Sequence, residues 1–66
     1  MDREQGIATI LDFVSRHRHS YASLAVCRRA IDTGVAEVTP EVLAALRHRL
    51  AGAADEEIAA YYSIVT

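Results

Sequence analysis

The sequence predicts an all-α fold, a compact bundle of four short helices over about residues 3–18, 21–33, 40–51 and 55–65. In each of these segments apolar residues recur at three- and four-residue spacing, which is typical of helices that bury one face. Residues that favour helix starts and stops separate the segments. Alternation of apolar and polar residues, which would indicate strands, does not extend over a useful length. With 66 residues, the chain is expected to form one domain, residues 1–66.

The first helix is expected over about residues 3–18, with Asp2 as its N-cap. A helical projection places one apolar stripe on it, made of Ile7, Ile10, Leu11 and Val14, with Phe13 at the margin. Ser20 is a suitable N-cap for the next helix, so the connection between the two helices should be tight.

The second helix is expected over about residues 21–33 and should stop at Gly34, because glycine commonly occupies the position after a helix. Its buried stripe is predicted to consist of Leu24, Cys27 and Ile31, with Val26 and Ala30 at one margin. On the exposed side, Arg28 and Asp32 have the i, i+4 spacing of a helical ion pair.

The third helix, about residues 40–51, has the clearest signals at both ends. Thr39 is a favourable N-cap, Pro40 suits the first helical position, and Gly52 follows as the stop. Val38 and Leu43 have the spacing of a hydrophobic staple. The predicted buried stripe consists of Val42, Leu43, Leu46 and Leu50.

The fourth helix, about residues 55–65, opens with three acidic residues, which suit the positive end of the helix dipole. Its apolar stripe consists of Ile58, Tyr61, Tyr62 and Val65, and Ile64 lies outside that arc. Tyr61 and Tyr62 point about 100° apart, so one of them should be left partly exposed. Because tyrosine is enriched at interfaces, the predicted partner-binding residues are Tyr61, Tyr62 and Ile64.

A domain of this size has a small core, which seldom supplies more than about 3–5 kcal/mol of stability. Cys27 is the only cysteine in the sequence, and this excludes an internal disulfide. The hydrophobic fraction of 52% is high for so short a chain and leaves apolar surface for a partner. The sequence therefore favours a protein–protein interaction module, a regulator or inhibitor that covers a partner surface. The partner would be another protein, in a hetero-complex, or a second copy in a homo-oligomer.

All seven basic residues are arginine, and six of them lie near predicted helix C-termini. Cations there complement the negative end of the helix dipole, which explains the pattern without a ligand. The alternative is a nucleic-acid-binding accessory protein or transcriptional regulator, in which a dimer would bring a basic patch onto one face, made of Arg16, Arg18, Arg28, Arg29, Arg47 and Arg49. The formal net charge of −2 argues against attraction of nucleic acid by the molecule as a whole.

Catalysis, metal binding and cofactor binding are not expected. No pair among His17, His19 and His48 has the i, i+4 spacing that would place two imidazoles on one helix face. Cys27 lies within an apolar stripe, where burial raises the pKa of a thiol and makes it inaccessible. Glycine-rich phosphate loops and nucleophile motifs are absent from the sequence.

No apolar stretch approaches the roughly 20 residues of a membrane span, and the N-terminal stretch does not resemble a signal peptide. The protein is therefore expected in the cytoplasm, without a membrane partner. The exclusive use of arginine and the abundance of alanine suggest a GC-rich genome, bacterial or phage.

Overall fold

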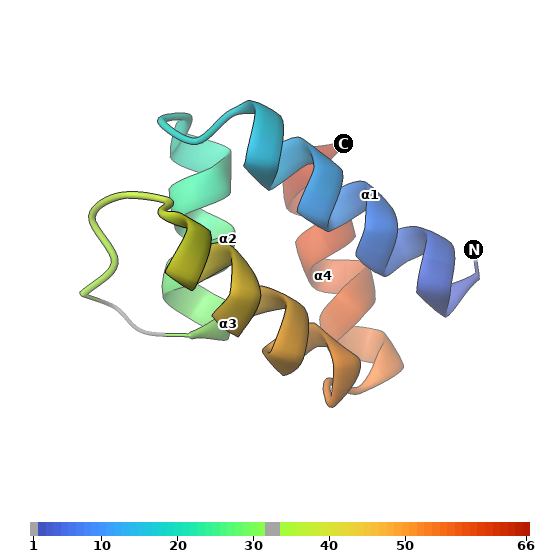
Figure 1. Cartoon of the computed structure of the whole chain (residues 1–66). Helices are drawn as coiled ribbons and strands as arrows, with labels where there is room; N and C mark the ends of the chain where they lie inside the picture. The colour runs from blue at the N-terminus through green and yellow to red at the C-terminus, as the bar shows by residue number, and fades with distance from the viewer. Residues whose placement is uncertain (1, 32–33) are drawn as a thin grey trace.

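The computed structural model describes residues 2–31 and 34–66. These residues form four helices: α1 (Arg3–Arg16), α2 (Tyr21–Ala30), α3 (Pro40–Ala51) and α4 (Asp55–Val65). The two described ranges contain no strand. The predicted all-α bundle of four short helices is therefore confirmed (Figure 1).

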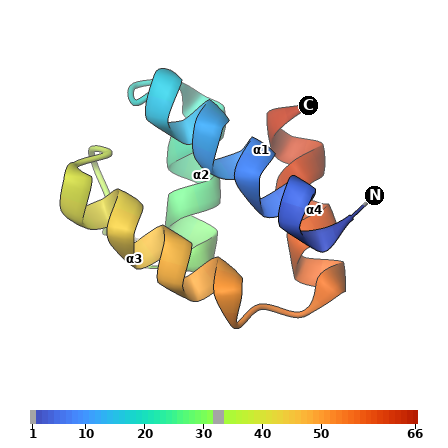
Figure 2. The ribbon, with the colours of Figure 1, turned by 45° about the vertical axis from the view of Figure 1, so that its right-hand side comes forward.

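The helices form two crossed pairs (Figure 1, Figure 2). In both views α1 and α3 run across the molecule in opposite directions, and α2 and α4 cross behind them. α1 packs against α3 and α4, and α2 packs against the same two helices. One side of the α1 and α3 pair therefore faces the core, and the other side faces away from α2 and α4.

All four helices contribute to the core. Its buried apolar residues within the helices are Ile10, Val14, Val26, Cys27, Ala30, Leu46, Leu50, Ile58, Tyr61 and Val65. Val38 and Ala53, from the connections on either side of α3, are buried with them. The ends of both connections are therefore anchored by packing, which positions α3 between its neighbours.

Three helix starts have the N-caps that the sequence predicts. The side chains of Asp2, Ser20 and Thr39 accept hydrogen bonds from backbone N–H groups in the first turns of α1, α2 and α3. Ala54, before α4, offers no such side chain, and the first turn of α4 carries three acidic residues instead. Gly52 follows α3 as the predicted stop.

The predicted ends of the first two helices are wrong. α1 ends at Arg16 rather than near residue 18, because Ser20 must be extended to cap α2 and the chain turns between the two helices. The N–H of Ser20 donates to the carbonyl of His17 at 3.0 Å and closes that turn. α2 ends at Ala30 rather than near residue 33, so Gly34 lies beyond the helix and does not cap it.

After α2 the chain turns back toward α3. Nε of Arg28 donates to the carbonyl oxygen of Val35 at 2.8 Å, and Val38 is buried in the core. This return explains why α2 is shorter than its pattern predicts, since Val38 has to reach the core just before α3 begins. The ion pair predicted between Arg28 and Asp32 lies outside the described residues.

The buried face of α2 is displaced from the predicted one. Leu24 is only half-buried and Ile31 is 36% exposed, whereas the buried residues are Ser23, Val26, Cys27 and Ala30. Cys27 is buried as predicted, but the face extends through Val26 and Ala30, at the predicted margin, to Ser23, a polar residue that an apolar stripe does not include. The hydroxyl of Ser20 donates to that of Ser23 at 3.0 Å, which satisfies the polar group that the packing buries.

Arg3 joins three helices at one end of the bundle. Its Nη1 forms an ion pair with Asp55 at the start of α4, with 2.8 Å between Nη1 and Oδ1. Its Nη2 donates to the carbonyl oxygens of Leu50 and Ala51, both at 3.2 Å. The last carbonyls of a helix have no partner within it, so Arg3 both caps α3 and holds the start of α1 against it.

Candidate functional site

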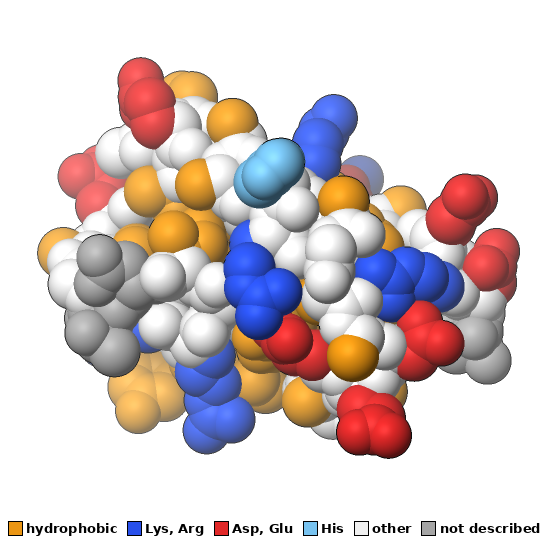
Figure 3. Space-filling view, turned by 90° about the horizontal axis from the view of Figure 1, so that it is seen from below, with side chains coloured by type: hydrophobic (Ala, Val, Ile, Leu, Met, Phe, Trp, Pro, Cys, Tyr) orange, Lys and Arg blue, Asp and Glu red, His pale blue; other side chains and the backbone are white. Residues whose placement is uncertain are grey.

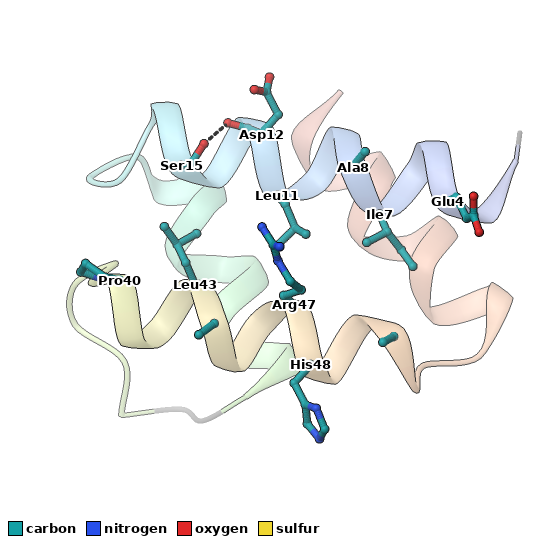
Figure 4. Close-up of a pocket in the computed structure, with 12 residues that line it drawn as sticks. Glu4, Ile7, Ala8, Leu11, Asp12, Ser15, Pro40, Leu43, Arg47 and His48 are labelled. Atoms are coloured by element: carbon teal, nitrogen blue, oxygen red, sulfur yellow. Dashed lines mark hydrogen bonds between the residues drawn. The ribbon is translucent and has the colours of Figure 1, made fainter.

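An open groove runs between α1 and α3 (Figure 4). We call it the α1/α3 groove and define it by its apolar lining, which consists of Ile7, Ala8, Leu11, Pro40, Leu43, Ala44 and Ala51. Charged side chains accompany the apolar ones on both helices: Glu4 and Asp12 on α1, and Arg47 on α3, where His48 lies beside it. The groove therefore combines an apolar floor with charged edges.

The groove exists because the apolar stripes of α1 and α3 are wider than the surface that the core covers. Ile10 is fully buried, but Ile7 and Leu11, further around α1, are only half-buried. On α3, Leu46 is fully buried and Leu43 is half-buried. The three half-buried aliphatic side chains line the same groove (Figure 4).

Other exposed apolar side chains do not form a comparable surface. Among the described residues the exposed large ones are Tyr21 and Ile31, which lie at opposite ends of α2. In the groove, by contrast, Ala8, Ala44 and Ala51 are small and exposed beside the larger aliphatic groups. Small residues allow close approach of another backbone, so the groove is a candidate docking surface.

The two edges of the groove carry opposite charges. Glu4 and Asp12 make the α1 edge acidic, and Arg47 makes the α3 edge basic. In Figure 4, Arg47 extends from α3 toward Leu11, whereas Asp12 and His48 point away to either side. An occupant of the groove would therefore meet a different charge along each edge.

Asp12, on the acidic edge, has an ion-pair partner within the chain, whereas Arg47, on the basic edge, has none among the described residues. Asp12 pairs with Arg16 one turn later on α1, with 3.1 Å between Oδ1 and Nε. Both side chains are exposed, so this pair contributes little to stability. Arg47 has no hydrogen bond or ion pair to any residue in the described ranges and is available to an external carboxylate.

The groove also contains a hydroxyl group. Its hydroxyl group, Ser15, donates to the carbonyl oxygen of Asp12 at 2.8 Å and is therefore engaged in its own helix. Residues 2–31 and 34–66 contain no group of three or more His, Cys, Asp or Glu side chains placed to hold a metal ion.

The structure separates the two tyrosines that the sequence identifies as contact residues. Tyr61 is 5% exposed and belongs to the core, whereas Tyr62 and Ile64 are half-buried. The prediction that one tyrosine would remain partly exposed is confirmed. Tyr61 itself is not on the surface: its ring is buried, and its hydroxyl donates to Oε2 of the half-buried Glu57 at 2.6 Å.

Tyr61 and Glu57 belong to a small polar network that also contains Arg49. The guanidinium of Arg49 lies 2.8 Å from Oε2 of Glu57. The hydrogen bond from Tyr61, followed by the attraction of Arg49, lowers the pKa of Glu57. Burial, followed by the hydrogen bond to the Glu57 carboxylate, raises the pKa of Tyr61 from 10.0 to about 12. The network links α3 to α4 and keeps the Tyr61 hydroxyl protonated.

High pH should destabilise the protein through Tyr61. Below pH 10 the hydroxyl is protonated in both the folded and the unfolded chain; between pH 10 and about 12 it ionises first in the unfolded chain. Ionisation then favours unfolding, and the free energy of unfolding should fall by about 2–3 kcal/mol across that range. Urea unfolding at several alkaline pH values measures this. Tyr61→Phe should lack this part of the decline, and the same decline in both proteins would contradict the assignment.

The arginines of the proposed basic patch do not gather on one face of the described chain. The ends of α1 and α2, which carry Arg16 and Arg29, lie on opposite sides of the molecule (Figure 1). Arg49 is paired with Glu57, and Arg28 binds a backbone carbonyl. On the face seen in Figure 3, basic side chains alternate with acidic ones. The single chain therefore presents no continuous basic surface on that face.

Cys27 and the histidines occupy structural positions. Cys27 is fully buried, and burial raises the pKa of its thiol. The ring of His17 lies against Phe13, with 4.6 Å between the ring centroids. His48 is exposed and points away from the groove floor (Figure 4). Cys27 and His17 do not line the groove, and His48 lies on its α3 side.

No family model, curated protein or solved structure matches the chain. Among the helices of the described ranges, none is both long and apolar enough to cross a membrane. A functional proposal must therefore rest on the groove itself.

Proposed function

We propose that the protein is a protein–protein interaction module that binds through the α1/α3 groove and regulates or inhibits its partner by covering the partner's surface. The observation that carries the proposal is the row of half-buried aliphatic side chains, Ile7, Leu11 and Leu43, in one groove. Removing apolar surface from water contributes about 25 cal/mol per Å², so covering this row would favour association. A binding role without catalysis agrees with the chemistry of the lining.

The charged edges support the same proposal. Complementary charges at the rim of an interface orient the partner and speed association more than they increase affinity. Here Glu4 and Asp12 flank one side of the apolar floor, and Arg47 flanks the other. A partner with an apolar stripe between a basic and an acidic edge would fit in one orientation.

Two further parts of the proposal concern α4 and location. Tyr62 and Ile64 are half-buried, and we keep them as a second candidate contact surface. Tyr61 does not belong to this surface, because its ring is in the core.

The buried thiol of Cys27 bears on the location of the protein. A lone buried thiol suits a reducing compartment, which supports a cytoplasmic site of action.

The test is a comparison of bait proteins that differ at one exposed alanine. Ala44→Arg places a long cation in the groove, and Ala59→Arg makes the same change at an exposed position on α4 that does not line the groove. Both should change stability by less than about 0.5 kcal/mol, because both positions are exposed. Circular dichroism checks that each variant is folded.

A partner that binds through the groove should be retained from a bacterial lysate by the wild type and by Ala59→Arg, and lost by Ala44→Arg. If all three baits retain the same protein, the partner binds to a surface other than the groove. If the wild type retains no protein and does not self-associate, the proposed function is wrong.

A further inference from the structure

We propose that the occupant of the α1/α3 groove is a second copy of this chain, bound with its own groove facing the first. The inference rests on the proposed function and names the partner. It is carried by the opposite charges on the two edges of the groove, because a surface that is acidic along one side and basic along the other can be complementary to itself.

Symmetry decides which edges meet. A two-fold axis that lies along the groove places α1 of one copy over α3 of the other, so each acidic edge meets a basic edge. A two-fold axis across the groove would place α1 over α1 and α3 over α3, and like charges would then face each other. The charge pattern therefore selects the axis along the groove.

Position along the groove supports this arrangement. A rotation about an axis along the groove leaves each residue at its own level along that axis. Asp12 and Arg47 lie at about the same level on opposite sides of the groove (Figure 4). In the dimer, Asp12 of each copy therefore faces Arg47 of the other. The long Arg47 side chain is exposed, so it can turn from Leu11 of its own chain toward that carboxylate.

The apolar floor fits the same dimer. Face to face, the two copies bring together the aliphatic rows Ile7, Leu11 and Leu43, whose side chains are half-buried in the single chain. Ala8 and Ala44, which also line the groove, are small and exposed and let the helix pairs approach closely. A domain with so small a core would gain stability from covering this surface, since binding to the folded state shifts the folding equilibrium.

Sedimentation from low micromolar to near-millimolar concentration tests the dimer. The wild type and Ala59→Arg should form dimers with the same dissociation constant, and Ala44→Arg should remain monomeric. A wild type that stays monomeric throughout overturns this inference but not the proposed function, which the bait comparison tests by itself. A dimer that persists in Ala44→Arg overturns the inference and assigns self-association to another surface.

A charge exchange tests the predicted pairing. Arg47→Glu and Asp12→Arg each turn two attractive pairs in the dimer into repulsive ones, so each variant alone should dimerise at least about tenfold more weakly. An equimolar mixture of the two should recover the wild-type affinity, because in the mixed dimer every acid again faces a base. If the mixture dimerises no better than the separate variants, the proposed axis and pairing are wrong.

Discussion

Replacing Leu46 by Ala should lower the free energy of unfolding by about 2–5 kcal/mol, because it removes a central core side chain and leaves a cavity. Leu46 is fully buried on α3, in the cluster to which all four helices contribute. Proteins of this size have about 3–5 kcal/mol in total, so the variant is expected to be largely unfolded at room temperature. Thermal and urea unfolding, followed by circular dichroism, measure the change.

Two variants make this prediction decisive even if Leu46→Ala does not fold. Leu46→Met nearly conserves volume and should cost less than about 1.5 kcal/mol. Leu43→Ala removes the same atoms from a half-buried groove position on the same helix and should cost clearly less than Leu46→Ala. If Leu43→Ala is the more destabilising of the two alanine variants, the buried face of α3 has been assigned incorrectly.

The helix starts could be read from the sequence because local chemistry determines them. Asp2, Ser20 and Thr39 cap three helices, as predicted, through side chains that accept backbone hydrogen bonds. The ends of α1 and α2 could not be read in this way. They depend on where the chain must go next, such as the return of Val38 to the core after α2, and helical periodicity does not contain that information.

The groove could not be predicted from the sequence, because it too depends on how the helices are arranged in space. Ile7, Leu11 and Leu43 have helical spacing, and the pattern places them in buried stripes together with Ile10 and Leu46. Periodicity shows which residues share a face, but only the crossing of the helices shows how much of that face is covered. In this bundle α2 and α4 cover one side of α1 and α3, and the remaining part of each stripe forms the groove.

Replacing Tyr61 by Ala should cost about 3–5 kcal/mol, a loss as large as that expected for Leu46→Ala. The substitution removes a ring that is 5% exposed and also removes the hydroxyl that donates to Glu57. Tyr61→Phe keeps the ring and should cost less, about 1.5–3 kcal/mol, the usual contribution of a hydrogen bond to a charged group. Comparing the two variants by urea unfolding separates the packing of the ring from the hydrogen bond.

Tyr62→Ala is the matched control on the neighbouring residue. Its ring is half-buried, so we expect a cost of about 1–2 kcal/mol and a chain that still folds. Dimerisation through the groove should be nearly unchanged in this variant, because Tyr62 does not line the groove. If Tyr62→Ala instead loses association while its unfolding free energy is preserved, the contact surface is on α4. If Tyr61→Ala folds as stably as Tyr62→Ala, the ring of Tyr61 is not part of the core.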